Sequence, residues 1–203
     1  MEPLCVNQAV LSGRAAQAPR LSHLNHGVRY YIFPLEVPRL SGTADVLNVV
    51  ASQQTLDACP VLPGECYTAT GEVRSFNNRS GVGSRLVITF FAKSLDPAED
   101  SPQNLLKLSG TLCKPTTLRR TPLGREICDL LLAVNRSYGR SDYLPCIAWG
   151  ALARACARLG TGDTLSLTGR LQSRKYRKVL ESGEEERTAY EISVLSLDQP
   201  GAD

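Results

Sequence analysis

Aromatic and basic residues are concentrated in one stretch of the chain, from Ser141 to Lys178. It contains the single Trp of the sequence, Trp149, and ends in the basic run Arg174–Lys178. Flat rings stack on unpaired bases, and Lys or Arg neutralise phosphates, so this combination is typical of a surface for single-stranded nucleic acid. Residues 104–178 hold 14 Lys/Arg against 4 Asp/Glu, although the net charge of the 203 residues is only +3. This concentration favours a polyanionic partner, nucleic acid first and an anionic membrane second.

Other groupings that could do chemistry are weaker. His23 and His26 have metal-like spacing, but no third ligand stands nearby, so we expect a loop pair, no metal and no other cofactor. Glu184–Glu186 could be paired carboxylates, but a solvated acidic turn accounts for them better. The sequence has no Gly-rich phosphate loop and no nucleophile elbow, and therefore predicts no enzyme. Seven scattered Cys without a CxxC pair predict free, buried thiols.

The sequence contains the same domain twice. At a shift of 97, 13 of the 46 positions from 7 to 52 are identical, where average composition gives about three. Among the identities are Gly13 with Gly110, Arg39 with Arg136, and Asp45 with Asp142. A shift of 98 then matches four more pairs: Gly64 with Gly162, Thr70 with Thr168, Gly71 with Gly169, and Ser75 with Ser173. We predict a first domain at 1–95, a linker at 96–103, a second domain at 104–198 and a short tail at 199–203.

Each copy is predicted to contain five strands, with a short helix between strands three and four. The ranges in the second copy are 104–113, 125–136, 143–149, a helix at 151–159, 164–168 and 190–197. Those in the first copy are 6–15, 28–37, 46–51, a stunted helix at 53–59, 66–75 and 85–93. This order predicts an all-β chain of two tandem OB-fold barrels, whose strands and hairpin loops bind single strands. The number of strands alone leaves other small barrels open.

The second copy resembles the bacterial single-stranded DNA-binding protein family along nearly its whole length. The motifs that carry the resemblance are NLLKLSGT from Asn104, KPTTLRRTPLGR from Lys114, LAVNR from Leu132, SDYLPCIAWGA from Ser141, Ala153-Arg154, Gly162-Asp163, and GRLQSRKYR from Gly169. Several separated motifs in the family's order are far more specific than one short pattern. The first copy matches through the internal repeat, with weak direct signals at NQAVLSG and GEVRS.

The resemblance implies which residues bind DNA. Stacking positions of the family hold Tyr143, Trp149 and Tyr176, and Tyr138 is a fourth candidate. The expected phosphate contacts are Arg136, Arg140, Arg170, Arg174, Lys175, Arg177 and Lys178. Trp149 closes an apolar strand and could instead belong to the core. For Tyr143, stacking and core packing are equally expected, and Arg136 could be a charge at the end of a strand. Arg119 and Arg120 could touch DNA or solvate a loop, and we do not include them.

The first domain has lost most of these positions. Through the repeat, Val46 stands for Tyr143, Ser52 for Trp149, Asn78 for Tyr176 and Glu72 for Arg170. Its remaining candidate DNA contacts are Phe76, Arg74 and Arg79. Tyr30, Tyr31 and Phe33 lie on an apolar strand and are expected in the core or in an interface. The second domain is therefore expected to carry most of the affinity, and the first to pair barrels and extend the site.

We therefore expect a sequence-independent binder of single-stranded DNA that acts in replication, recombination or repair. A primosome-type adaptor that works through protein contacts and a single-stranded RNA binder are the alternatives. The family usually brings four barrels together, so the resemblance implies that a chain with two barrels forms a homodimer. It also implies replication or repair proteins as partners. The sequence has no charged-then-apolar leader and no long apolar run, so a cytoplasmic, nucleoid-associated protein without membrane contact is expected. The tail lacks the acidic, Phe-tipped peptide with which the family recruits enzymes, so recruitment by that route is not expected.

Overall fold

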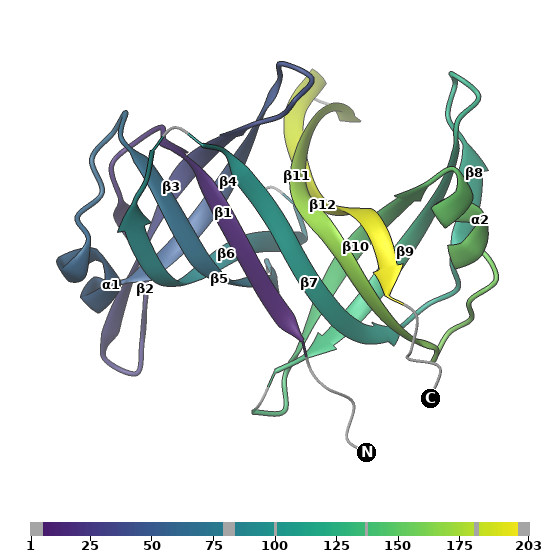
Figure 1. The fold of residues 1–203 in the computed structure, drawn as a ribbon, viewed down its shortest axis with the longest axis horizontal. Coiled ribbons are helices and arrows are strands. Elements are labelled where there is room, and N and C mark those ends of the chain that lie inside the picture. The colour runs from purple at the N-terminus through teal and green to yellow at the C-terminus, as the bar shows by residue number, and fades with distance from the viewer. Residues whose placement is uncertain (1–5, 79–83, 100, 137, 181–182, 199–203) are drawn as a thin grey trace. The chain divides into compact units, whose positions relative to one another are not determined.

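The computed structural model describes residues 6–78, 84–99, 101–136, 138–180 and 183–198, apart from the side chains of Lys178 and Leu180. These residues form twelve strands and two short helices (Figure 1). They divide into two compact units. The first-barrel unit contains Ala9–Asn104 with Gln172–Tyr190, and the second-barrel unit contains Leu105–Leu171 with the described residues 6–8 and 191–198.

The first barrel is built from five main strands: β1 (Asn7–Ala15), β3 (Val28–Pro38), β4 (Ala44–Ser52), β5 (Cys66–Asn77) and β6 (Leu86–Pro97). Their order is β3-β4-β6-β5-β1, and a further pairing of β1 with β3 closes the sheet on itself. The β4–β6 pair is parallel and its neighbours are antiparallel. Alternate residues point inward, and Phe33 and Phe90 are fully buried in the core.

The second barrel repeats this arrangement. Its main strands are β7 (Gln103–Leu112), β9 (Glu126–Asn135), β10 (Ser141–Trp149), β11 (Thr164–Leu180) and β12 (Gly183–Asp198). Their order is β9-β10-β12-β11-β7, closed by pairing of β7 with β9. The core is formed by aliphatic side chains such as Leu108, Leu132, Leu144 and Leu167, each at most 1% exposed.

Two of the repeated glycines lie where each barrel closes. A Cβ on Gly13 would lie 2.3 Å from the carbonyl oxygen of Glu36, and one on Gly110 would lie 2.5 Å from that of Ala133. Both distances are shorter than any real contact, so the first strand can cross the next only where it has no side chain. The shared glycine therefore follows from the shared closure of the two barrels.

The prediction of an all-β chain with two tandem OB barrels is confirmed. Each barrel also has a further strand, β2 (Arg20–Asn25) paired with β3 and β8 (Thr117–Arg120) paired with β9, in segments where no strand is predicted. Helix α1 (Gln53–Ala58) follows β4, and α2 (Ala151–Cys156) follows β10. The predicted domain boundaries, with a linker at 96–103, stay a prediction.

The outer part of the β11–β12 hairpin, Gln172–Tyr190, belongs to the first-barrel unit although its strands begin and end in the second barrel. We call these residues the arm. The arm contains Tyr176, a predicted stacking residue. It also contains three predicted phosphate contacts with described side chains: Arg174, Lys175 and Arg177. Which surface the arm contacts therefore matters for the candidate site.

Candidate nucleic-acid interface

Two predicted stacking residues, Tyr143 and Trp149, lie on strand β10 of the second barrel. They are separated by six positions, so both point to the same face of the strand, while Leu144, Cys146 and Ala148 point into the core. Tyr143 is 45% exposed and Trp149 is 38% exposed. Neither ring is therefore part of the barrel core.

The loop between β9 and β10 is held by a buried ion pair between Arg136 and Asp142. Nε of Arg136 donates to one carboxylate oxygen at 2.7 Å, and Nη2 donates to the other at 2.5 Å. The Asp142 side chain is fully buried. The hydrogen bonds to Asp142 raise the pKa of Arg136 above its ordinary value, although burial opposes this shift. Arg136 therefore stabilises the loop, and its contact with phosphate stays a prediction.

Tyr138, on the same loop, is exposed and lies beside this pair. Nη1 of Arg136 donates to its hydroxyl oxygen at 3.3 Å, and the guanidinium lies 6.0 Å from the ring centroid. Arg140 is exposed, and its carbonyl accepts from the Arg136 amide at 2.6 Å. Arg170, on β11, is half-buried, and its Nε is a buried nitrogen with no hydrogen-bond partner among the described residues. An additional acceptor, such as a phosphate oxygen, would satisfy that nitrogen.

The arm presents cations beside a ring. The guanidinium of Arg174 lies 5.9 Å from the centroid of the Tyr176 ring. Lys175 pairs with Glu186 at 3.0 Å, and Arg177 pairs with Glu184 at 3.5 Å. All four of these paired side chains are at least 60% exposed, so each pair is worth about 0–1 kcal/mol. Such weak pairs can exchange a carboxylate for a phosphate at small cost.

The candidate contacts of the first barrel lie on β5. Phe76 is exposed. Arg74 is only partly exposed, and its guanidinium lies 3.6 Å from the centroid of the Phe91 ring while it donates to Glu72 at 3.1 Å. Arg79, the side chain of Lys178 and the tail at 199–203 lie outside the described residues.

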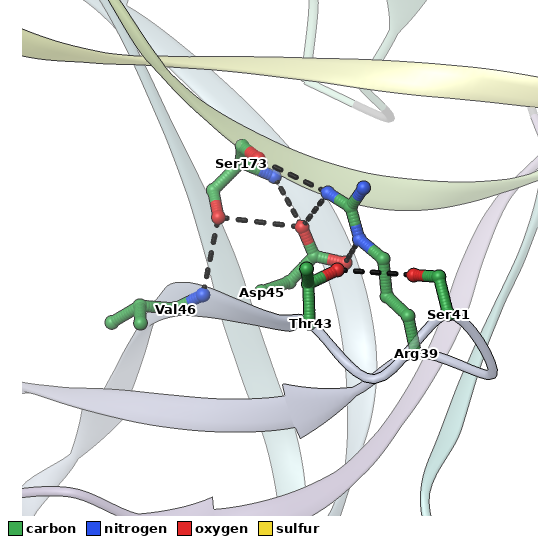
Figure 2. A network of polar contacts seen from close by, with 6 residues as sticks. All are labelled: Arg39, Ser41, Thr43, Asp45, Val46 and Ser173. Carbon is green, nitrogen blue, oxygen red and sulfur yellow. Dashed lines mark hydrogen bonds and ion pairs between the residues drawn. The ribbon is translucent and has the colours of Figure 1, made fainter.

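A second buried carboxylate, Asp45, fixes the arm on the first barrel (Figure 2). Arg39 donates to both of its oxygens, with Nε at 2.7 Å from Oδ2. From the arm, the Ser173 amide donates to Oδ1 at 2.6 Å and the Ser173 hydroxyl lies 3.3 Å from it. The Ser173 hydroxyl oxygen in turn accepts from the Val46 amide at 3.1 Å. We call this set the Asp45 latch.

The arm makes one further polar contact along β4. Nδ2 of Asn48 donates to the Tyr190 hydroxyl oxygen at 3.2 Å, and burial raises the pKa of that tyrosine. Val46 and Asn48 occupy the stretch of β4 that corresponds to the start of β10, where Tyr143 stands. On the first barrel this stretch contacts the chain's own arm, which agrees with the absence of a stacking ring at Val46.

Comparisons with known proteins show what each barrel is similar to. Residues 103–199 match the model of the single-strand binding protein family. The matched residues are those of the second barrel, which is therefore similar to the domain of that family. This confirms the resemblance that the motifs indicate, and Tyr143 and Trp149 lie within the matched residues.

Two curated relatives show the extent of the match. The chain is 32% identical over 100 residues to the single-stranded DNA-binding protein of Bacillus cereus, covering 46% of this chain and 56% of that protein. It is 35% identical over 101 residues to that of Thermus thermophilus, covering 48% of this chain and 37% of that protein. The chain spans about half the length of the first curated relatives that it matches.

A solved structure shows the same fold over both repeats. The wild-type single-stranded DNA binding protein from Thermus aquaticus has a TM-score of 0.79 at 22% identity, covering 98% of this chain and 94% of that chain. At this identity the likeness shows the fold alone. It supports the tandem OB arrangement, including the first repeat, which the family model does not reach.

Sequence reasoning missed the role of the two buried aspartates. Asp45 and Asp142 recur with the same spacing from Arg39 and Arg136, and this repeated Arg–Asp spacing was a signal for paired charges. It also left out Arg119, which lies opposite Ile127 on β8, while Trp149 lies opposite Ile127 from the other side. Arg119 and Trp149 therefore lie two strands apart on the same side of the sheet, and Arg119 is paired with Asp129 at 2.5 Å.

The described residues can also be searched for reactive cysteines, metal sites and membrane-spanning helices. Among the described cysteines, Cys59, Cys128, Cys146 and Cys156 are buried and Cys113 is exposed. In this part of the chain no three His, Cys, Asp or Glu side chains come together in a way that could hold a metal ion. No helix within the described ranges has the length and apolar character needed to span a membrane.

Proposed function

We propose that this protein binds single-stranded DNA without sequence preference and protects it during replication, recombination or repair. The observation that carries the proposal is the pair of rings, Tyr143 and Trp149, on one exposed face of a domain that matches the single-strand binding protein family. The curated relatives that match about half of this chain are named single-stranded DNA-binding proteins. The proposed role is non-catalytic, because stacking and charge neutralisation suffice for it.

In the proposed mechanism, unpaired bases stack on Trp149 and Tyr143, and a further base stacks on Tyr176. Each stacked base contributes about 1–3 kcal/mol, and every base has a suitable face, so little sequence preference results. Arg174, Lys175 and Arg177 bind phosphates. To do so, Lys175 must leave Glu186 and Arg177 must leave Glu184, which costs about 0–1 kcal/mol for each pair. Arg140 and Arg170 are the proposed phosphate contacts of the second barrel, and Tyr138 is a further stacking position.

The proposal is tested by the affinity of full-length variants for oligothymidine. We expect Trp149→Ala and Tyr143→Ala each to weaken binding by about 1–3 kcal/mol, because a stacking ring is lost. Leu123→Ala is a matched control, since it also removes an exposed apolar side chain from the second barrel. Wild-type affinity in both ring variants would rule the stacking mechanism out.

The second barrel is proposed to contribute more affinity than the first. Cutting the chain into halves would not test this cleanly, because it would separate Ser173 from Asp45 and undo the latch. Within the full chain, Phe76→Ala should weaken binding less than Trp149→Ala does. A larger loss with Phe76→Ala would reverse the assignment.

Three finer points belong to the same proposal. Competition of oligothymidine against oligouridine tests whether the ligand is DNA or RNA, since stacking alone accepts both. A homodimer with four barrels is proposed, and light scattering would measure its mass. A cytoplasmic, nucleoid-associated location and replication or repair proteins as partners would follow from the ligand, and co-isolation with and without nuclease tests both.

A further inference from the structure

Three rings form a row on the outer face of the first barrel. His23 on β2 stacks on Tyr30 of β3, with centroids 5.0 Å apart and planes 8° apart. Tyr30 also contacts Phe91 of β6, with centroids 5.8 Å apart and planes inclined by 41°. Such separations are those of favourable aromatic pairs. We call His23, Tyr30 and Phe91 the aromatic row.

The aromatic row is not part of the barrel core. On β3 the inward positions are those of Phe33, Leu35 and Val37, each at most 1% exposed, so Tyr30 points outward. Tyr30 and Phe91 are partly exposed, and His23 is exposed. Of the two places expected for Tyr30, core or interface, the barrel core is therefore excluded, whereas Phe33 does lie in the core. A surface row of rings needs an explanation other than core packing.

This row lies where the second barrel carries Trp149. In the second barrel Trp149 is paired across the strands with Ile127. The repeat places Ser52 at the position of Trp149 and Tyr30 at that of Ile127, and Ser52 and Tyr30 are likewise cross-strand partners. The first barrel therefore has no ring on β4, where Ser52 replaces the Trp, but it has the ring of Tyr30 on the neighbouring strand β3. The two positions lie on the same face of the sheet.

Positive charge surrounds the aromatic row. The Arg74 guanidinium lies 3.6 Å from the centroid of the Phe91 ring, and Arg20 is exposed opposite Ile32, one outward position beyond Tyr30. Lys93 and Arg74 both bind Glu72. Burial alone would raise the pKa of Glu72, but the hydrogen bonds from these two cations outweigh burial and lower it. Two cations thus share one carboxylate, which leaves a net positive site next to the rings.

We propose that the aromatic row is a second base-stacking site, at which the first barrel binds an unpaired base of single-stranded DNA. This rests on the proposed function and deepens it, because it assigns a DNA contact to the barrel that lacks the family's stacking positions. The exposed His23 ring lets a base extend the existing stack. Arg20 and Arg74 are placed to bind the phosphates that flank the base, as cations do beside stacking platforms.

The test uses full-length protein and oligothymidine carrying photoreactive 5-iododeoxyuridine. Cross-linked peptides are identified by mass spectrometry, and we expect cross-links at His23, Tyr30 or Phe91 in addition to those in the second barrel. Cross-links elsewhere in the protein but at none of these three rings would overturn the second site. This arm of the experiment needs no variant, so a folding defect cannot obscure it.

Affinity of variants provides an independent reading. Tyr30→Leu should weaken binding of a long oligothymidine about 5- to 20-fold, the lower part of the range for a stacking ring, because His23 and Phe91 remain. Tyr30→Phe keeps the ring and should bind like the wild type, as should Tyr31→Leu, which removes a ring on the inward side of the same strand. Equal affinity of Tyr30→Leu and Tyr30→Phe would contradict the proposal.

The quenching of Trp149 separates the two levels of failure. Suppose that oligothymidine fully quenches Trp149 in the Tyr30→Leu variant, that this variant binds as tightly as the wild type, and that no cross-link falls on the aromatic row. Only the second site then fails. If the wild-type protein shows neither quenching nor binding, the proposed function fails and the second site fails with it.

Discussion

The Asp45 latch makes a prediction that the structure lets us quantify. Asp45 is 1% exposed and accepts hydrogen bonds from Arg39 and from the amide of Ser173. Asp45→Ala leaves the Arg39 guanidinium and that amide without this acceptor. Breaking a buried ion pair costs about 3–5 kcal/mol. Because the Arg39 side chain remains 25% exposed and regains some hydration, we expect a loss of about 2–4 kcal/mol in the free energy of unfolding.

A double-mutant cycle isolates the arm's share of this loss. Ser173→Ala removes the hydroxyl that lies 3.3 Å from Asp45 and accepts from the Val46 amide, and should cost about 0.5–1.5 kcal/mol. Since Asp45 and Ser173 are direct partners, their effects should not add, with a coupling of about 0.5–2 kcal/mol. A latch that holds the arm requires this coupling.

The assay is urea denaturation followed by circular dichroism, with limited proteolysis of the arm as a second readout. Asp57→Ala is the matched control, because Asp57 is an exposed carboxylate of α1 that accepts from Gln53 at 2.7 Å. It should change stability by no more than about 0.5 kcal/mol. Additive effects of Asp45→Ala and Ser173→Ala, or a loss no larger than that of Asp57→Ala, would refute the reasoning.

Three further predictions follow from single sites. Gly110→Ala should destabilise the protein by about 1–3 kcal/mol, measured by thermal unfolding, because the new Cβ would lie 2.5 Å from the Ala133 carbonyl; unchanged stability would contradict the closure argument. A maleimide should label exposed Cys113 quickly and Cys156 only after unfolding, since burial raises the pKa of Cys156 to about 11, and mass spectrometry would show any early labelling of Cys156. Arg177→Ala should lower the slope of log affinity against log salt by about 0.7 in oligothymidine titrations, and an unchanged slope would remove Arg177 from the phosphate contacts.

The barrels could be predicted from the sequence because two patterns can be seen in it directly. One is the repeat of the whole domain, and the other is the alternation of inward apolar residues along each strand. Gly13 and Gly110 mark the closure, and the apolar residues at every second position mark the core. The additional strands β2 and β8 could not be predicted in the same way. Their residues are exposed along their whole length, so no burial pattern marks them as strands.

The family motifs imply Tyr143 and Trp149 as stacking residues. The structure leaves both rings exposed, and their contact with bases stays a prediction. The outward position of Tyr30 was not predictable, because β3 carries apolar residues on both faces and alternation cannot distinguish them. The contact of Ser173 with Asp45 joins residues 128 positions apart, and no local signal in either segment indicates it.

The most direct test of the central claim is the fluorescence of Trp149 during titration with oligothymidine at increasing salt. The chain has a single Trp, so the signal reports one place on the second barrel. Stacking of a base on Trp149 predicts saturable quenching, with an affinity that falls as salt rises. An unchanged emission spectrum at oligothymidine concentrations that saturate binding by sedimentation would contradict the claim that bases stack on this face.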